Sequence, residues 1–134
     1  MHALPEPPPV KRVLVVDDLA LIHRVAARTL EAVGFAVEGV ESSDEAIKLL
    51  HRQSFDVLVT DVYMPDGDGF ELLSHVREHF PELKIVVMSG RFSIDSYGTA
   101  LMHSLTDLGA HAVLMKPFRP SDLLDAIEQA ISTA

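Results

Sequence analysis

The chain has no cysteine, a shortage of basic residues and no long apolar run. Its 134 residues include 11 Lys and Arg against 20 Asp and Glu, so the formal net charge at pH 7 is −9. The missing cysteines exclude disulfides, thiol catalysis and thiolate metal sites, and they fit a reducing compartment. The acidic balance argues against nucleic-acid binding, which needs a basic surface. Without a membrane span or signal peptide, the sequence predicts one small cytoplasmic domain that needs no membrane.

The first residues differ in composition from the rest of the chain. The segment MHALPEPPP holds four of the eight prolines and has no periodic pattern. We therefore expect residues 1–10 to form a flexible proline-rich tail and residues 11–134 to form the folded domain.

Short apolar runs then alternate with segments of helical spacing. Strands are predicted over residues 12–17, 36–40, 55–60, 85–88 and 112–115. Helices are predicted from stripes beginning near Ile22, Ser42, Phe70, Tyr97 and Pro120. This alternation predicts an α/β fold: a doubly wound five-stranded parallel sheet of order 2-1-3-4-5, with five helices on both faces.

Two of the predicted helices have local signals at their ends. In the first, the stripe of Ile22, Ala26 and Leu30 extends to Val33, and Gly34 follows as a stop. In the second, Ser42 with Glu45 three residues later predicts a capping box.

Two of the apolar runs end in aspartate. Residues 13–16 run into Asp17 and Asp18, and residues 57–60 run into Asp61. In a parallel sheet these carboxylates meet at the carboxyl ends of neighbouring strands, where doubly wound sheets bind ligands. The next two strands end at Ser89 and Lys116. Clustered carboxylates suit a hard cation that keeps some of its waters, so the sequence predicts a Mg²⁺ site.

Together these segments resemble the receiver domain of two-component response regulators, over about residues 11–132. The resemblance is in VLVVDD (13–18), the D-x-x-M-P-x-x-x-G stretch (61–69), Ser89-Gly90 and Lys116-Pro117-Phe118. It implies that Asp61 accepts a phosphoryl group. It also implies that Asp17, Asp18, Asp61 and the backbone carbonyl of Tyr63 form the Mg²⁺ site.

The resemblance implies further roles and partners. Ser89 and Lys116 are expected to contact the phosphoryl group, and the Lys116–Pro117 bond is expected to be cis. The donor would be a phosphohistidine on a sensor histidine kinase or a histidine phosphotransfer protein. The protein would then act by switching its binding to an unidentified partner, a homodimer among the options, rather than as an enzyme that turns over a substrate.

The chain departs from the family pattern in places. Val113 stands where an aromatic switch residue is usual, so a relay from Ser89 to an aromatic side chain is in doubt. The loop 90–96 is longer than usual and is either a specificity element or a tolerated insertion. Tyr63 and Arg91 are expected to flank the phosphoryl group and lengthen its lifetime.

Other interpretations were weighed against this one. His75 to His79 matches the H-x-x-E-H motif of some zinc peptidases, but a solvated helix face is the expected role. No ligand cluster was expected from the other histidines (2, 23, 51, 103 and 111). A docking module that works without phosphorylation remains the alternative function. A phosphohydrolase is disfavoured, because Tyr63 stands where such enzymes place a second aspartate. The sequence leaves open whether the chain is a stand-alone receiver or a fragment of a larger regulator, and the absence of a trailing linker mildly favours the first.

Overall fold

The protein is described by a computed structural model, in which residues 10–62, 69–89 and 106–133 are described. The strands are β1 (Arg12–Val16), β2 (Ala36–Val40), β3 (Val57–Asp61), β4 (Lys84–Ser89) and β5 (Ala112–Met115). The helices are α1 (Ala20–Glu31), α2 (Ser43–Arg52), α3 (Gly69–His79) and α5 (Pro120–Ser132). Residues 1–9 of the predicted tail, the loop 90–96, and Tyr63 and Arg91 lie outside the described residues. So does most of the fourth predicted helix, near residues 97–108.

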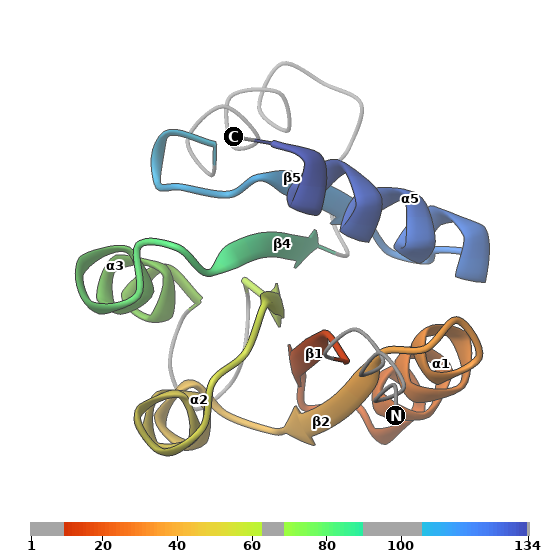
Figure 1. The fold of residues 1–134 in the computed structure, drawn as a ribbon, viewed down its shortest axis with the longest axis horizontal. Coiled ribbons are helices and arrows are strands. Elements are labelled where there is room, and N and C mark those ends of the chain that lie inside the picture. Colours follow the sequence, from red (N-terminus) through yellow and green to blue (C-terminus); the bar gives the residue numbers. More distant parts are fainter. Residues whose placement is uncertain (1–9, 63–68, 90–105, 134) are drawn as a thin grey trace, which may run out of the picture.

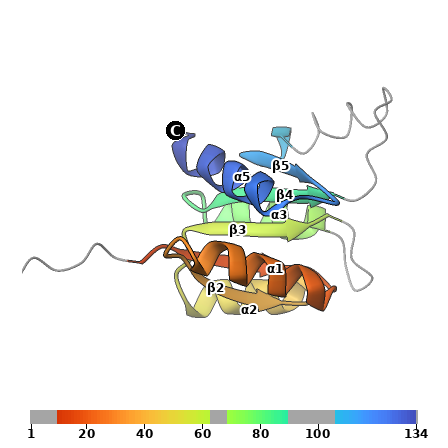
Figure 2. The ribbon, with the colours of Figure 1, turned by 90° about the vertical axis from the view of Figure 1, so that its right-hand side faces the viewer.

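The five strands form one parallel sheet with the order β2-β1-β3-β4-β5, as the sequence predicts. Helices α1 and α5 cover one face, while α2 and α3 cover the other (Figure 1). Figure 2 shows β3, β4 and β5 running in the same direction, with their arrowheads at one edge of the molecule. This edge is the carboxyl rim of the sheet.

The middle strands are buried on both faces because helices cover both sides of the sheet. Val13 and Val15 of β1 pack with α1 and α5, whereas Leu14 and Val16 pack with α2 and α3. All four residues are completely buried. This packing explains why β1 and β3 read as continuous apolar runs, and it fixes where each run ends.

Two local predictions differ from the structure. Helix α1 ends at Glu31, and Gly34 adopts a positive φ of 96°, a conformation that favours glycine. Val33 therefore falls in the turn and is 55% exposed, so its predicted place on the buried stripe is wrong. The capping box is only half formed. Ser42 Oγ accepts from the Glu45 N–H, but the Glu45 carboxylate accepts from Glu41 N–H instead of Ser42 N–H.

In the part of the chain that the structure describes, the helices are too short or too polar to cross a bilayer.

Candidate functional site

The carboxyl rim brings together the five side chains that the sequence singled out. Asp17 and Asp18 follow β1, Asp61 and Ser89 end β3 and β4, and Lys116 follows β5. We call these five residues the strand-end site. The three aspartates each offer a carboxylate oxygen, and these oxygens lie within 4.8 Å of one another. Asp17 is fully buried, Asp61 is 7% exposed, and Asp18 is exposed.

Lys116 joins two of these carboxylates. Its Nζ donates to Asp17 Oδ2 at 2.5 Å and to Asp61 Oδ2 at 3.0 Å. Burial would lower the pKa of Lys116, but the hydrogen bonds and charges of the two aspartates reverse this effect and raise it. The lysine is therefore a fixed positive charge between two carboxylates.

The single lysine does not fully neutralise the site. Burial raises the pKa of Asp17, and the hydrogen bonds from Lys116 and from the Leu19 N–H only partly oppose it. The negative charge of Asp61 raises the pKa of Asp17 further. A divalent cation among the carboxylates would relieve this repulsion, so the residues present fit a hard metal ion with oxygen ligands.

Ser89 adds a hydroxyl at the end of β4. Its side chain is 1% exposed, and its Oγ has no hydrogen-bond partner among the described residues. Buried hydroxyls are normally satisfied, so this atom is suited to donate to a ligand oxygen. The Ser89 carbonyl accepts from the Lys116 N–H at 2.7 Å, which holds the ends of β4 and β5 together. The Lys116–Pro117 bond is cis, the isomer that the resemblance implied.

Sequence reasoning missed one neighbour of the site, His23 of α1. Its Nε2 lies 2.7 Å from the Asp17 carbonyl oxygen. A carbonyl can only accept, so Nε2 bears the hydrogen and the buried Nδ1 is left without a partner among the described residues. The ring lies directly over Gly39, where an added Cβ would sit 2.1 Å from Nδ1. A glycine inside a short strand is the sequence signal that could have revealed this close approach.

Three other histidines also lie closer together than the sequence suggested. His51 lies at the end of α2. Its Nε2 is 3.0 Å from the Nε2 of His75 on α3. His79 follows one turn later, with its ring centroid 4.2 Å from that of His75. The sequence could not show this contact between His51 and His75, because it does not reveal that these ends of α2 and α3 meet.

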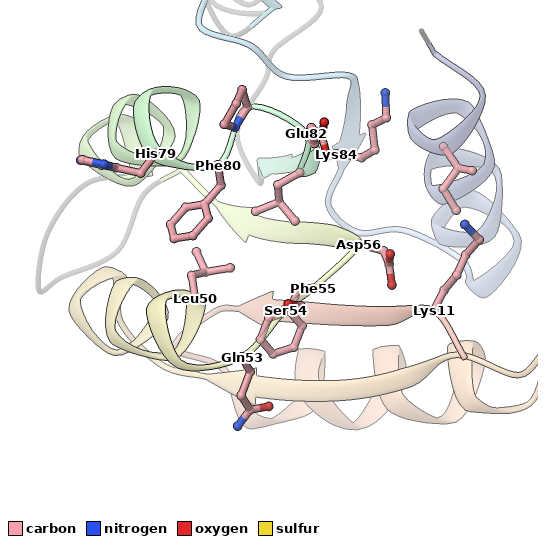
Figure 3. A pocket seen from close by; sticks show the side chains of 13 residues that line it. Lys11, Leu50, Gln53, Ser54, Phe55, Asp56, His79, Phe80, Glu82 and Lys84 are labelled. Carbon is pink, nitrogen blue, oxygen red and sulfur yellow. The ribbon is translucent and has the colours of Figure 1, made fainter. Parts of the chain in front are cut away.

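A hollow of about 550 Å³ lies away from the strand-end site (Figure 3). It opens at the amino ends of β3 and β4, and its lining includes Asp56, Lys84, Phe55 and Phe80. The converging carboxylates are at the opposite rim, so we place the functional site there and not in this hollow.

The fold and the strand-end site define a class of protein, a doubly wound α/β domain with an acidic site at the carboxyl rim of its sheet. The chain belongs to the response regulator receiver domain family, whose model matches residues 13–128. It is therefore a receiver domain of two-component signal transduction.

Individual relatives agree with this assignment. The chain is 31% identical over 126 residues to the response regulator receiver protein CpdR of Brucella abortus, covering 93% of this chain and 100% of that protein. It is 33% identical over 120 residues to the DNA-binding transcriptional regulator NtrC of Proteus hauseri, covering 90% of this chain but 24% of that protein. Among solved structures, chemotaxis response regulator CheY4 of Vibrio cholerae aligns with a TM-score of 0.82 at 29% identity, covering 91% and 99% of the two chains.

The chain spans about a quarter of the length of the NtrC relatives that it matches. The similarity to NtrC thus concerns the receiver part alone.

Proposed function

We propose that this protein is a phosphoacceptor whose Asp61 takes a phosphoryl group from a phosphohistidine and whose surface then changes its affinity for a partner protein. The observation that supports this proposal is the geometry of the strand-end site in a member of the receiver family. Three carboxylates lie within 4.8 Å, and Lys116 bridges Asp17 and Asp61.

The transfer is a single displacement at phosphorus. A carboxylate oxygen of Asp61 forms the new O–P bond while the P–N bond to the donor imidazole breaks. The leaving nitrogen keeps the electron pair and takes a proton from solvent. Asp61 is 7% exposed, so its side chain is largely held in place by its surroundings.

Lys116 and Ser89 are assigned to the phosphoryl oxygens. The Lys116 ammonium already lies 3.0 Å from Asp61 Oδ2, so it is beside the oxygen charge that develops in the transition state. The Ser89 hydroxyl is buried at the same rim and has no partner in the described structure, so it can donate to a second oxygen.

Mg²⁺ is assigned to the aspartates. Asp18 and Asp61 would bind it directly and Asp17 through a water, as the resemblance implies, with the backbone carbonyl of Tyr63 as a further ligand. When bound, the ion supplies neutralisation of phosphoryl charge. Bound before phosphorylation, it would also offset the charge of Asp61, which adds to the effect of burial in raising the pKa of Asp17.

Family membership implies interaction with a histidine kinase or a histidine phosphotransfer protein. We assign the donor to this class and leave the output partner to experiment. Val113 pairs with Val87 in the sheet, so any signal to the output surface must travel without an aromatic ring at that position.

The test is a mass measurement on the intact protein. With Mg²⁺ and acetyl phosphate, we expect a mass gain of one phosphoryl group in the wild type and in the control Asp125→Asn, whose aspartate is exposed on α5. The gain should be lost in Asp61→Asn and when the metal is removed by a chelator.

Other outcomes point to the competing functions. A wild type that gains no mass would support a docking module of the same fold. Repeated release of phosphate without modification of Asp61 would support a phosphohydrolase.

A further inference from the structure

The strongest unexplained cluster lies away from the strand-end site, on the helices that cover the opposite side of the sheet from α1. It consists of His51 from α2 and of His75 and His79 from α3, and we call it the histidine cluster. His75 and His79 are four residues apart, so they share one helix face. Helices α2 and α3 lie side by side over the sheet (Figure 1). This packing brings His51 against His75.

Two members of the cluster, His51 and His75, have the spacing of metal ligands. The Nε2 atoms of His51 and His75 are 3.0 Å apart. Two Zn–N bonds of about 2.0–2.1 Å at a tetrahedral angle end roughly 3.3 Å apart, so an ion bound to both nitrogens needs only a small outward shift. At present one nitrogen must donate a hydrogen to the other, and a metal ion would replace that shared hydrogen.

His79 would become the third ligand once its side chain turns, because the three residues as they stand do not bring one nitrogen each within 4.8 Å of one another. Its ring centroid lies 4.2 Å from that of His75 and 5.9 Å from that of His51. Figure 3 shows His79 at the end of α3 beside Phe80, whose ring lies between it and Leu50 of α2. Because His79 is exposed, its side chain can turn toward the other two without disturbing packed residues.

The surroundings favour ligation over protonation. His75 is only partly exposed, and burial together with the neighbouring His79 and His51 lowers its pKa. Neutral imidazole is the form that binds metals, so the cluster keeps a ligand available near neutral pH. The Phe80 ring packs against His51, with centroids 4.9 Å apart, and this contact limits the freedom of that side chain.

We propose that His51, His75 and His79 form a site for a borderline divalent transition-metal ion of the Zn²⁺ class, which would join α2 to α3. Imidazole ligands select Zn²⁺ and its neighbours, whereas Mg²⁺ prefers oxygen. The protein would then have two metal sites of different chemistry, at the carboxyl rim and on the α2–α3 surface. The proposal does not depend on phosphorylation of Asp61.

The test is a ZnCl₂ titration followed by calorimetry in excess Mg²⁺. The proteins are the wild type, His51→Gln, His75→Gln and the control His111→Asn, in which the asparagine oxygen can replace the Nδ1 that accepts from the Ile85 N–H. Zn²⁺ bound by the aspartates is common to all four proteins. The informative quantity is therefore any additional Zn²⁺ binding that depends on the histidine cluster.

We expect this additional binding to have a stoichiometry of one Zn²⁺ per chain in the wild type and in the control. Loss of a residue that only orients a ligand typically weakens metal binding 10–100-fold, so loss of a ligand itself should weaken it at least about tenfold. NMR should show shifts of the His51 and His75 imidazole signals on binding. Equal Zn²⁺ affinity in all four proteins, or no saturable binding beyond the aspartates, would overturn the proposal. Thermal melts without Zn²⁺ verify that each variant is folded.

Discussion

Replacement of Lys116 by methionine probes the electrostatics of the strand-end site directly. Methionine retains most of the apolar stem but removes the charge that lies 2.5 Å from Asp17 and 3.0 Å from Asp61. At an effective dielectric constant near 20, each of these attractions amounts to about 5–7 kcal/mol before desolvation is subtracted. Breaking a buried ion pair by removing one partner typically costs about 3–5 kcal/mol, because a buried charge is left uncompensated.

We expect Lys116→Met to lower the free energy of unfolding by about 3 kcal/mol at neutral pH in the presence of a chelator, the lower end of that range. The lower end of the range applies because burial already raises the pKa of Asp17. Once the lysine is gone, Asp17 can take up a proton and avoid a buried, unpaired charge. The loss should shrink as the pH falls and Asp17 is protonated in the variant. It should also shrink in Mg²⁺, which replaces the missing positive charge.

The raised pKa of Lys116 determines how the free energy of unfolding changes in alkaline solution. A cation with a raised folded pKa adds stability below its ordinary value of 10.5, and this stability is lost as the pH rises through the folded pKa. The difference between wild type and variant should therefore persist through neutral pH and close only under strongly alkaline conditions.

Urea unfolding followed by circular dichroism is the assay. The matched control is Lys48→Met, because Lys48 is exposed on α2 and its replacement should change stability by no more than about 0.5 kcal/mol. A loss in Lys116→Met as small as that of the control, in the presence of chelator, would refute the reasoning.

Three further predictions concern other parts of the molecule. Gly39→Ala should lower stability by about 1–3 kcal/mol in urea unfolding, because its Cβ would displace His23 from the Asp17 carbonyl; an unchanged midpoint would contradict this. The double variant Tyr63→Ala, Arg91→Ala should lose its phosphoryl group faster than the wild type in a dephosphorylation time course, and an equal or slower rate would defeat the assigned role. Burial and a nearby lysine lower the pKa of His111, so the stability from its neutral form is present above pH 6.5 and is lost as the pH falls through the folded pKa; the acid loss should be smaller in His111→Asn, and an identical pH profile would argue against it.

The sheet was predictable because its central strands are buried on both faces. Continuous apolar runs ending in Asp17 and Asp61 fixed both the strands and the rim at which they end. Strand boundaries were less certain. Strand β3 begins at Val57 rather than at the predicted Phe55. Phe55 precedes the paired residues of the sheet, and its ring packs under the Arg12 guanidinium, whose carbon lies 4.8 Å from the ring centroid.

Contacts between elements were the part that the sequence did not predict. His23 approaches Asp17 only because Gly39 leaves space beneath its ring, and His51 meets His75 only because α2 and α3 pack together. Periodicity assigns a side chain to a face of its own helix. It does not say which side chain of a neighbouring helix lies opposite, so the contact between His51 and His75 has no signature in a single sequence.

Chemical mapping of the modified residue is the sharpest test of the assignment of the phosphoryl group to Asp61. After reaction with acetyl phosphate and Mg²⁺, borohydride reduces an aspartyl phosphate to homoserine, which peptide mass spectrometry can locate in the chain. We expect homoserine at position 61, dependent on Mg²⁺ and absent without the phosphodonor. Homoserine at position 17 or 18 instead, or at none of the three aspartates in a protein shown to be folded, would contradict it.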